Sequence, residues 1–459
     1  SLIKVPADIS KSLRDSLEEQ AEAWVDRNQR LPAAIQQLLE RQPLPALKAL
    51  NDELKSDPNR VGELLTEFLA SKSGITLALQ GPPGTGKSTV TGQVIAQLGK
   101  QGKRIAISSN SHAAINNLLK KAKRTCAEAG VGGQVVKCSN TKEEAMADAD
   151  IAVLKPGQLD KGSVVVGGTT WTFCRKELAD QFDLLVVDEA GQMSLANLMV
   201  MACCARSILL VGDQQQLAQP SQADHPGDSG QSCLELWMQG KPVVPDDRGV
   251  FLPTSWRMEP SLTAMVSELF YEGRLQAHPG NCANCITWRS ASKSRNGELY
   301  PGQGLVFEAV EHSGRSMHAP EEIDRIDELV DALLGSRYAI ARGNRTEEGL
   351  LDANTILVTA PYNVQVNRLQ QRLHGRARVG TVDKFQGQEA PVAIHSLTAS
   401  SGDEAPRGVG FLLEPNRLNV AISRAQCLSI VVGSPGLASG VANTVAEAEQ
   451  INRLCTLMN

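Results

Sequence analysis

The segment GPPGTGKST, residues 81–89, has the residue types and spacing that bind the phosphates of a nucleotide. Its glycines let backbone N–H groups surround a β-phosphate, Lys87 reaches the β- and γ-phosphates, and the Ser88 hydroxyl can bind Mg²⁺. A β-rich apolar run at 75–80 precedes the loop and a helical pattern follows it, which is the context that a P-loop needs. The predicted phosphate-binding residues are Gly81, Pro82, Pro83, Gly84, Thr85, Gly86, Lys87, Ser88 and Thr89.

Two later segments end in polar residues suited to the same chemistry. FDLLVVDEAGQM (182–193) is predicted to be a buried parallel strand ending at Asp188, a carboxylate for Mg²⁺, and Glu189, a base that orients the attacking water. A lone acid pair at a strand end is commonly only solvated, but a P-loop upstream at this separation favours the functional interpretation. SILLVGDQQQLAQP (207–220) ends in a glutamine run, and Gln192 and Gln216 are neutral groups suited to sensing a γ-phosphate or a water.

The elements that position these residues form one α/β pattern, and a second pattern begins near residue 250. The second half has no P-loop, and it reads as a second parallel sheet with its helices. One nucleotide site and two similar halves predict a nucleotide clamped between them. The second half is expected to contain helices at 260–273 and 362–373 and strands at 304–310, 355–361, 377–382, 391–397 and 428–435.

The segment NRLNVAISRAQC, residues 416–427, is predicted to be a helix in which Arg417 and Arg424 share one face. One interpretation is an amphipathic helix whose arginines are solvated. The other is that the guanidinium groups face an anion held by another part of the protein.

Composition limits the class of protein. The 459 residues are 42% hydrophobic and 21% charged, as in a globular protein of two to four domains. No apolar run is long enough to cross a bilayer, and ten scattered cysteines are typical of reduced thiols in a cytoplasmic protein. The net charge of −5 means that any nucleic-acid binding must depend on local patches. Because the chain opens on serine, we expect a fragment of a longer protein.

Seven segments together resemble the superfamily 1B helicases of the up-frameshift (nonsense-decay) type. The resemblance is closest to the helicase half of bacterial proteins in which such a helicase follows a RecB-like nuclease. It implies two RecA-like domains, which we assign to residues 74–249 and 250–459. The residue pattern predicts a helical segment at 1–73, and the stretch near 126–163 has room only for a small insert. The resemblance also implies ATP hydrolysis with Mg²⁺ and 5′-to-3′ movement along single-stranded nucleic acid. The segments are GPPGTGKST, SSNSHAAINNL, VVDEAGQM, LVGDQQQLAQP, SWRMEP, GTVDKFQGQE and NRLNVAISRA.

The resemblance also assigns residues in the second half of the chain. Arg257 and Arg424 match the two arginines that these enzymes direct at the γ-phosphate, so Arg424 is expected to be an arginine finger in cis and Arg417 to brace the helix or an acidic neighbour. Trp256 stands where the family usually has a tyrosine that stacks on adenine. Gly387 and Glu389 match a loop that touches the γ-phosphate and the ribose.

The predicted contacts to single-stranded nucleic acid also come from motif positions. Short hydroxyls and amides suit backbone phosphates. The matching residues are Ser109, Asn110, His112, Thr169, Thr170, Pro361, Tyr362, Thr381 and Val382. Two basic clusters favour a strand path, although either can be a solvated face: Lys120, Lys121, Lys123 and Arg124, and then Arg368, Arg372, Arg376, Arg378 and Lys384.

This chain departs from the family in several places. Residues 1–73 are helical in pattern and lack the β-barrel of the nonsense-decay enzyme, and no glutamine-containing adenine motif stands before the P-loop. Cys282 and Cys285 form a CxxC pair near His278, but zinc normally takes four ligands and no second pair is evident. The acidic run at 141–150 is expected to be a solvated surface segment.

Three functions compete for these motifs. The first is an ATP-driven single-strand translocase and helicase, with DNA favoured over RNA and with an upstream nuclease domain of the same polypeptide as a candidate partner. The second is an ATP-gated clamp that binds strands without separating them. The third, a small-molecule P-loop kinase, requires a lid and an acceptor pocket, whereas this chain has a second α/β half with two arginine motifs.

Overall fold

A computed structural model describes residues 7–25, 31–139, 151–218, 227–290, 297, 299–343, 345–440 and 442–458. The chain forms two compact units. Unit 1 comprises Ser1–Gly81, Gly86–Gln214 and Ala218–Leu252, and unit 2 comprises Pro82–Thr85, Gln215–Leu217 and Pro253–Asn459. The acidic run predicted at 141–150 lies outside the described residues.

Unit 1 contains a parallel sheet whose described strands follow the order β4-β3-β5-β2-β6-β7-β1-β8. The central strands are buried on both faces, as continuous apolar runs in a parallel sheet require. The strands are β1 (Thr76–Gln80), β2 (Ile105–Ser108), β3 (Gln134–Cys138), β4 (Ala152–Leu154), β5 (Ser163–Gly167), β6 (Phe182–Val187), β7 (Ala205–Gly212) and β8 (Gly249–Phe251).

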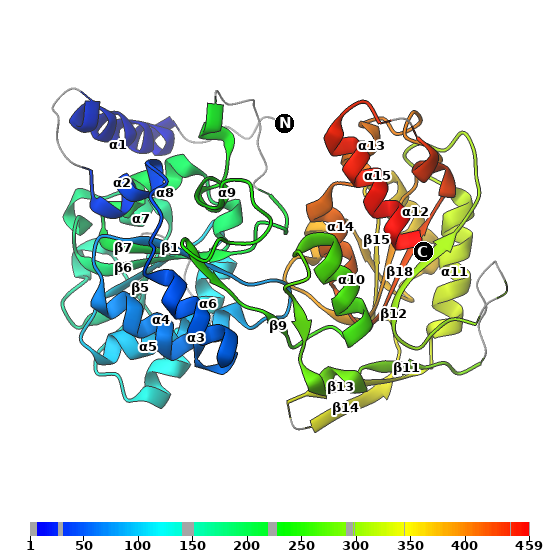
Figure 1. Ribbon diagram of the computed structural model, residues 1–459, viewed down its shortest axis with the longest axis horizontal. Coiled ribbons are helices and arrows are strands. Elements are labelled where there is room, and N and C mark those ends of the chain that lie inside the picture. The colour runs from blue at the N-terminus through cyan, green and yellow to red at the C-terminus, as the bar shows by residue number, and fades with distance from the viewer. Residues whose placement is uncertain are drawn as a thin grey trace. The chain divides into compact units, whose positions relative to one another are not determined.

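Helices cover both faces of this sheet. In Figure 1, α4, α5 and α6 lie on one face and α7 and α8 on the other. Their apolar sides join the strands in one core that includes Val94, Ile95 and Leu119. The helices are α5 (Lys87–Lys100), α6 (His112–Ala129), α7 (Thr170–Phe173), α8 (Leu195–Ala202) and α9 (Cys233–Met238).

The segment predicted to be helical before the P-loop is helical, and its second half is part of the core of unit 1. Leu47, Leu54 and Leu65 belong to the same core as β1. The Gln37 side chain accepts a hydrogen bond from the Thr76 backbone N–H at 2.7 Å, which fixes the start of the strand that leads to the P-loop. The helices are α1 (Ala7–Val25), α2 (Ala33–Leu39), α3 (Leu47–Ser56) and α4 (Val61–Ser71).

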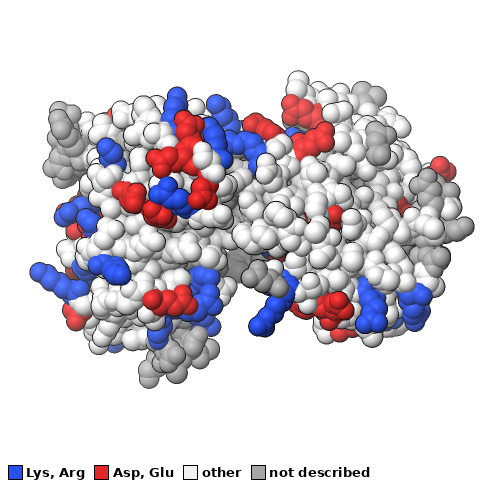
Figure 2. Space-filling model, turned by 60° about the horizontal axis from the view of Figure 1, so that its bottom comes forward, with Lys and Arg blue, Asp and Glu red and all other residues white. Residues whose placement is uncertain are grey.

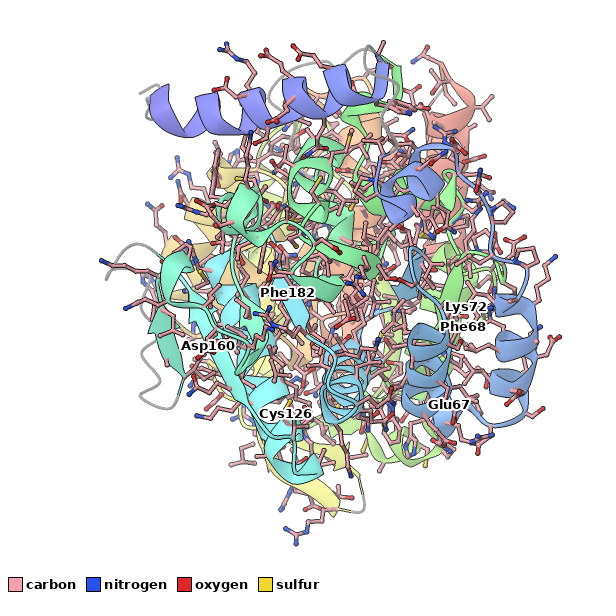
Figure 3. All side chains as sticks on the ribbon, turned by 90° about the vertical axis from the view of Figure 1, so that its left-hand side faces the viewer. Glu67, Phe68, Lys72, Cys126, Asp160 and Phe182 are labelled. Atoms are coloured by element: carbon pink, nitrogen blue, oxygen red, sulfur yellow. The ribbon has the colours of Figure 1, made fainter. Side chains whose placement is uncertain are left out.

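The start of β6 is held by aromatic packing. Phe182, labelled in Figure 3, lies edge to face against Phe173 with ring centroids 5.7 Å apart. The Arg104 guanidinium lies 5.1 Å from the centre of the Phe182 ring. These contacts anchor the strand whose other end carries Asp188 and Glu189.

Unit 2 contains a second parallel sheet of described strands, in the order β12-β18-β17-β15-β16. Residues of α11 and α12 complete the core on one face, and Figure 1 shows α10 and α14 on the other side from α11. The elements are α10 (Pro260–Phe270), β12 (Gly304–Ala309), α11 (Pro320–Leu333), β15 (Ile356–Thr359), α12 (Asn363–Leu373), β16 (Arg378–Gly380), β17 (Ala390–Ser396), α13 (Gly408–Leu412), α14 (Pro415–Ile422), β18 (Ala425–Gly433) and α15 (Val445–Met458).

Two small sheets complete the described part of unit 2. One is antiparallel, in the order β11-β13-β14, and the other pairs β9 with β10 in parallel. Their strands are β9 (Thr254–Ser255), β10 (Gln276–Ala277), β11 (Cys285–Thr287), β13 (Arg337–Arg342) and β14 (Arg345–Leu350).

The predicted α/β class with two parallel sheets and a helical N-terminal segment is therefore confirmed. The described part of the stretch predicted to hold a small insert supplies β3 and β4 at one edge of the first sheet. Among the described helices, none combines the length and the apolar character that a membrane span requires.

The contact between β1 and β8 leaves no room for a side chain at Gly249. An added Cβ would overlap the carbonyl oxygen of Ala78 and lie 2.9 Å from its carbonyl carbon. We expect Gly249→Ala to lower the free energy of unfolding by about 1–3 kcal/mol, because a buried backbone would have to shift. Denaturant unfolding measures the effect. The control is Gly132→Ala, at which an added Cβ meets no atom within 4 Å; equal stability of the two variants would contradict the prediction.

Candidate nucleotide and nucleic-acid site

The topology of unit 1 brings the predicted residues to one edge of its sheet. β2, β6, β7 and β1 are consecutive in the sheet, and each is followed at its carboxyl end by a predicted segment. The segments are 109–112 after β2, 188–192 after β6, 213–216 after β7 and 81–89 after β1. The carboxyl edge of a parallel sheet is where such folds bind ligands.

The P-loop has the backbone shape that phosphate binding requires. Gly84 and Gly86 have φ values of +75° and +80°, which glycine adopts without strain. Gly86 directly precedes α5, so the N–H groups of the first helical turn face the loop. The Lys87 ammonium donates a hydrogen bond to the carbonyl oxygen of Gly81, and the Gly81 N–H donates to Gly212 at 3.0 Å.

Asp188 is partly buried beside Glu189. Burial and the neighbouring Glu189 raise the pKa of Asp188 to about 7, while Lys87 and a hydrogen bond from the Glu189 N–H oppose the rise. A divalent cation would remove this penalty, and the carboxylate of Asp188 with the hydroxyl of Ser88 are the hard oxygen ligands that Mg²⁺ prefers. The residues present therefore fit the metal that the P-loop implies.

Glu189 has a strained backbone. Its φ is +53°, in the left-handed region that costs a residue with a side chain roughly 1–3 kcal/mol. This left-handed conformation redirects the chain from the end of β6 into the short helix Ala190–Gln192. Gly191 is needed there, because an added Cβ would lie 3.1 Å from the carbonyl oxygen of Asp213 at the end of β7.

Asn110 and Gln192 are joined directly. The Asn110 amide donates a hydrogen bond to the backbone carbonyl of Gln192. Asn110 was predicted to contact nucleic acid and Gln192 to sense the nucleotide, so one hydrogen bond links the two predicted functions. This contact is not evident from the sequence, because the two residues follow different strands, β2 and β6.

In unit 2, the first part of the P-loop packs on residues 255–257. The Ser255 hydroxyl donates to the carbonyl of Pro83 at 3.1 Å, and the Trp256 N–H donates to that of Gly84 at 2.9 Å. A Cβ on Gly84 would collide with that of Arg257 and lie 3.2 Å from its backbone nitrogen. Trp256 and Arg257 therefore lie beside residues 82–85, the part of the P-loop that belongs to unit 2.

The Trp256 ring is stacked on His278. Their centroids are 3.8 Å apart and the planes differ by 21°. Both residues directly follow paired strands, since Ala277 of β10 pairs with Ser255 of β9. The indole remains 47% exposed, so it has ring surface available for a base as well as for the histidine.

Arg257 forms an ion pair that the sequence did not indicate. Its guanidinium donates to Glu389 at 2.7 Å and to the carbonyl of Ser423 at 3.1 Å. Glu389 also accepts from Arg342 at 3.3 Å and from Gln426 at 3.0 Å. Burial raises the pKa of Glu389, but Arg257 and Arg342 outweigh it, so the pKa lies below its ordinary value. A fixed carboxylate thus holds Arg257 in place.

The predicted placement of Arg424 on a helix with Arg417 is wrong. α14 ends at Ile422, and Arg424 lies between it and β18, which begins at Ala425. The strand begins early because Ala390 of β17 pairs with Ala425 and donates a hydrogen bond to the Arg424 carbonyl at 3.0 Å. The Arg424 side chain is 3% exposed and donates to the carbonyl of Gln388 at 3.2 Å.

Arg417 has the bracing role that was expected. It donates to Glu414 at 2.6 Å and to Asp383 at 3.4 Å.

Gln216 is flanked by two residues that contact α14. The carbonyl of Gln215 accepts from Asn419 at 2.7 Å, and Leu217 packs with Val420.

The residues predicted to contact nucleic acid differ in exposure. Asn110 is exposed, whereas Ser109 is buried. His112 begins α6, and Thr169 directly precedes α7. Thr170 is buried with its hydroxyl against the Met201 sulfur at 3.8 Å, so its side chain is occupied.

The same group in unit 2 follows the carboxyl ends of β15 and β16. Pro361 and Thr381 are partly exposed. Val382 packs in a small apolar cluster with Val420, so only its backbone is suited to a strand. Tyr362 is 8% exposed, and its ring contacts Phe411 with centroids 5.5 Å apart.

Acidic residues of α11 neutralise two of the five cations in the second basic cluster. Arg372 pairs with Asp324 at 3.2 Å and Asp327 at 2.7 Å, and Arg376 pairs with Asp327 and Asp331. In the first cluster, Arg124 pairs with Glu128 at 3.8 Å. On the face drawn in Figure 2, basic side chains are interspersed with acidic ones.

The cysteines do not form a metal site in the described part of the chain. No group of three or more histidine, cysteine, aspartate or glutamate side chains there is arranged to hold a metal. Cys282 is exposed and Cys285 is partly buried. Burial raises the pKa of Cys126 and Cys138 to about 11 and that of Cys233 to about 12.

Comparison with known proteins finds similarity to AAA domains, to helicases and to a DNA-binding protein. Two family models, each described as an AAA domain, match residues 62–225 and 230–436. The DNA-binding protein SMUBP-2 of Rattus norvegicus is 26% identical over 452 residues, covering 83% of this chain and 43% of that protein. The DNA replication ATP-dependent helicase/nuclease DNA2 of Gallus gallus is 28% identical, and the match covers 88% of this chain and 38% of that protein. A regulator of nonsense transcripts 1 homolog of Drosophila melanogaster is 27% identical, and the match covers 78% of this chain and 33% of that protein. The chain thus spans less than half the length of these relatives.

Proposed function

The chain belongs to the superfamily 1B helicases, and we propose that it is an ATP-dependent motor that moves 5′ to 3′ along single-stranded nucleic acid. The observation that carries the proposal is the P-loop at the end of β1, whose Lys87 lowers the pKa of the partly buried Asp188 at the end of β6. A phosphate-binding amine and a partly buried carboxylate at one sheet edge are the minimum for Mg²⁺-dependent hydrolysis of ATP.

Each predicted residue has a role in this chemistry. Ser88 and Asp188 would hold Mg²⁺, which neutralises phosphate charge when bound. The loop amides and Lys87 bind the phosphates, while Glu189 accepts the proton of the attacking water, which Gln192 and Gln216 help to orient.

Unit 2 supplies the remaining roles. Arg257 and Arg424 stabilise the charge that develops on the γ-phosphate, and Glu389 and Gly387 shape the loop beside Arg257. Trp256 stacks on the adenine ring. The two RecA-like domains, 74–249 and 250–459, then grip and release the strand in turn as ATP binds and is hydrolysed.

We favour DNA as the strand. Two of the three relatives described above have DNA in their names, and one of these is a helicase and nuclease. By the same analogy, a nuclease domain of the same polypeptide and a role in DNA repair are part of the proposal. The ten cysteines, all free thiols, support a cytoplasmic site of action.

The deciding experiment measures ATP hydrolysis with matched DNA and RNA oligonucleotides, together with displacement of a strand from a duplex with a 5′ tail. Stimulation by DNA and displacement from the 5′-tailed duplex are expected. Stimulation without displacement would favour the alternative, an ATP-gated clamp. Hydrolysis that no strand stimulates would contradict both functions.

A further inference from the structure

The first residues of the connection between β17 and α13 in unit 2 are buried and form hydrogen bonds with other parts of the unit. The Glu322 carboxylate on α11 accepts hydrogen bonds from the Thr398 N–H at 3.0 and 3.1 Å. The Ser400 hydroxyl is 2.7 Å from His312 Nδ1 and accepts from the Arg315 N–H at 3.0 Å. This connection leads to Arg407 at the carboxyl edge of the sheet, the edge that also carries Tyr362.

Arg407 itself is held on an aromatic ring. Its guanidinium carbon lies 3.8 Å from the centre of the Phe411 ring. The turn that allows this contact is made by Gly408, whose φ is +74°. The Phe411 ring contacts Tyr362 in turn, so Arg407 is an exposed cation fixed by packing rather than by an acid.

A second arginine, Arg417, lies over the same ring and differs from Arg407 in its ion pairs. The Arg417 guanidinium lies 4.9 Å from the Phe411 centre, but Glu414 and Asp383 neutralise it. Across the residues that the structure describes, no carboxylate lies within ion-pair distance of Arg407. Of the two cations on this ring, Arg407 is the one that can take an anion from outside.

The Tyr362 hydroxyl gives a second, independent observation. Tyr362 is more than nine-tenths buried, and no described residue forms a hydrogen bond with its hydroxyl. Burial raises the pKa of Tyr362 and the nearby Arg407 lowers it, with a net rise, so the hydroxyl keeps its proton and remains a donor. A buried donor without a partner costs about 1–3 kcal/mol, and an incoming oxygen atom would remove that cost.

We propose that Arg407, stacked on Phe411 and adjoining the Tyr362 hydroxyl, binds a backbone phosphate of the single strand. This proposal rests on the function proposed above and adds a contact that the helicase motifs did not indicate. A guanidinium group presents paired N–H donors that match phosphate oxygens, and the Phe411 ring keeps it oriented. Phe411 is a positioning residue because it acts through Arg407.

The test measures binding of a fluorescent oligo-dT strand by anisotropy across a series of salt concentrations. Arg407→Ala is expected to weaken binding roughly 10-fold and to reduce the slope of log K against log salt by about 0.7, the value for one phosphate contact on a single strand. Arg407→Lys should keep the slope but lose part of the affinity, because the charge remains and the stacked plane is lost. Phe411→Ala should weaken binding, and adding it to Arg407→Ala should weaken it no further.

Arg345→Ala is the matched control, because Arg345 is an exposed arginine on β14 of the small antiparallel sheet. In one outcome, the wild-type protein binds the strand while the Arg407→Ala variant keeps the same affinity and salt slope. That result would overturn the phosphate site and leave the proposed function standing. A wild-type protein that binds no strand would instead overturn the proposed function. Binding of inorganic phosphate that is lost in Arg407→Ala, together with a strand affinity that is the same in Arg407→Ala and the wild type, would identify a free-anion site and overturn the strand contact.

Discussion

Replacing Lys87 with alanine is expected to abolish ATP turnover, with hydrolysis falling at least about 10³-fold. Lys87 begins α5 and contacts the Gly81 carbonyl. Its removal takes away the cation that binds the β- and γ-phosphates. It also removes one of the interactions that oppose the raised pKa of Asp188, so the carboxylate that would hold Mg²⁺ becomes harder to ionise. Phosphate release at saturating ATP and single strand measures the effect.

The control for this change is Lys100→Ala. Lys100 is the last residue of the same helix and is exposed, so its loss alters the charge without touching the loop. Both variants should unfold at similar temperatures, since neither lysine is part of the core. Turnover in the Lys87 variant equal to that in the Lys100 variant would contradict the assignment of the P-loop.

Replacing Arg424 is expected to reduce kcat on the order of 10³-fold while nucleotide binding changes little. A group that acts on charge developing in the transition state affects kcat and not ground-state affinity. Arg424→Lys is the sharper variant, because it keeps a cation in a site that is 3% exposed. Its ammonium lacks the planar fork of donors, so most of the loss should remain.

Stability must be separated from catalysis at this position. Arg424→Ala leaves a cavity and deprives the Gln388 carbonyl of its donor, so thermal unfolding of each variant is measured beside its turnover. Affinity for a fluorescent ATP analogue gives the second readout. A folded Arg424→Lys protein with nearly normal kcat would show that Arg424 only joins α14 to β18.

The parts of the site that lie within one strand–loop–helix unit were predictable from the sequence. The apolar run before the P-loop, the glycines and Lys87 are contiguous, and local rules determine their structure. The same holds for Asp188 and Glu189 at the end of β6. The boundaries of these segments can be read from the sequence, because each strand ends where its polar residues begin.

The contacts between distant segments were not predictable. Arg257 pairs with Glu389, and Arg376 pairs with Asp327, because tertiary packing brings their elements together. A helical pattern that ran through Arg424 was misleading for a related reason. Pairing of Ala425 with Ala390 ends the helix after Ile422, and strand pairing over long separations overrides local helical propensity.

The exposed thiol of Cys282 makes this protein suited to site-specific labelling. Maleimides react with thiolates, and burial raises the pKa of thiols such as Cys126 and Cys233, which keeps them protonated and inert. Cys282 lies in the turn Pro279–Ala283, directly after the histidine on which Trp256 is stacked. A fluorophore attached there would be four residues from the histidine that stacks on Trp256, and we expect its brightness to change when a base binds the indole.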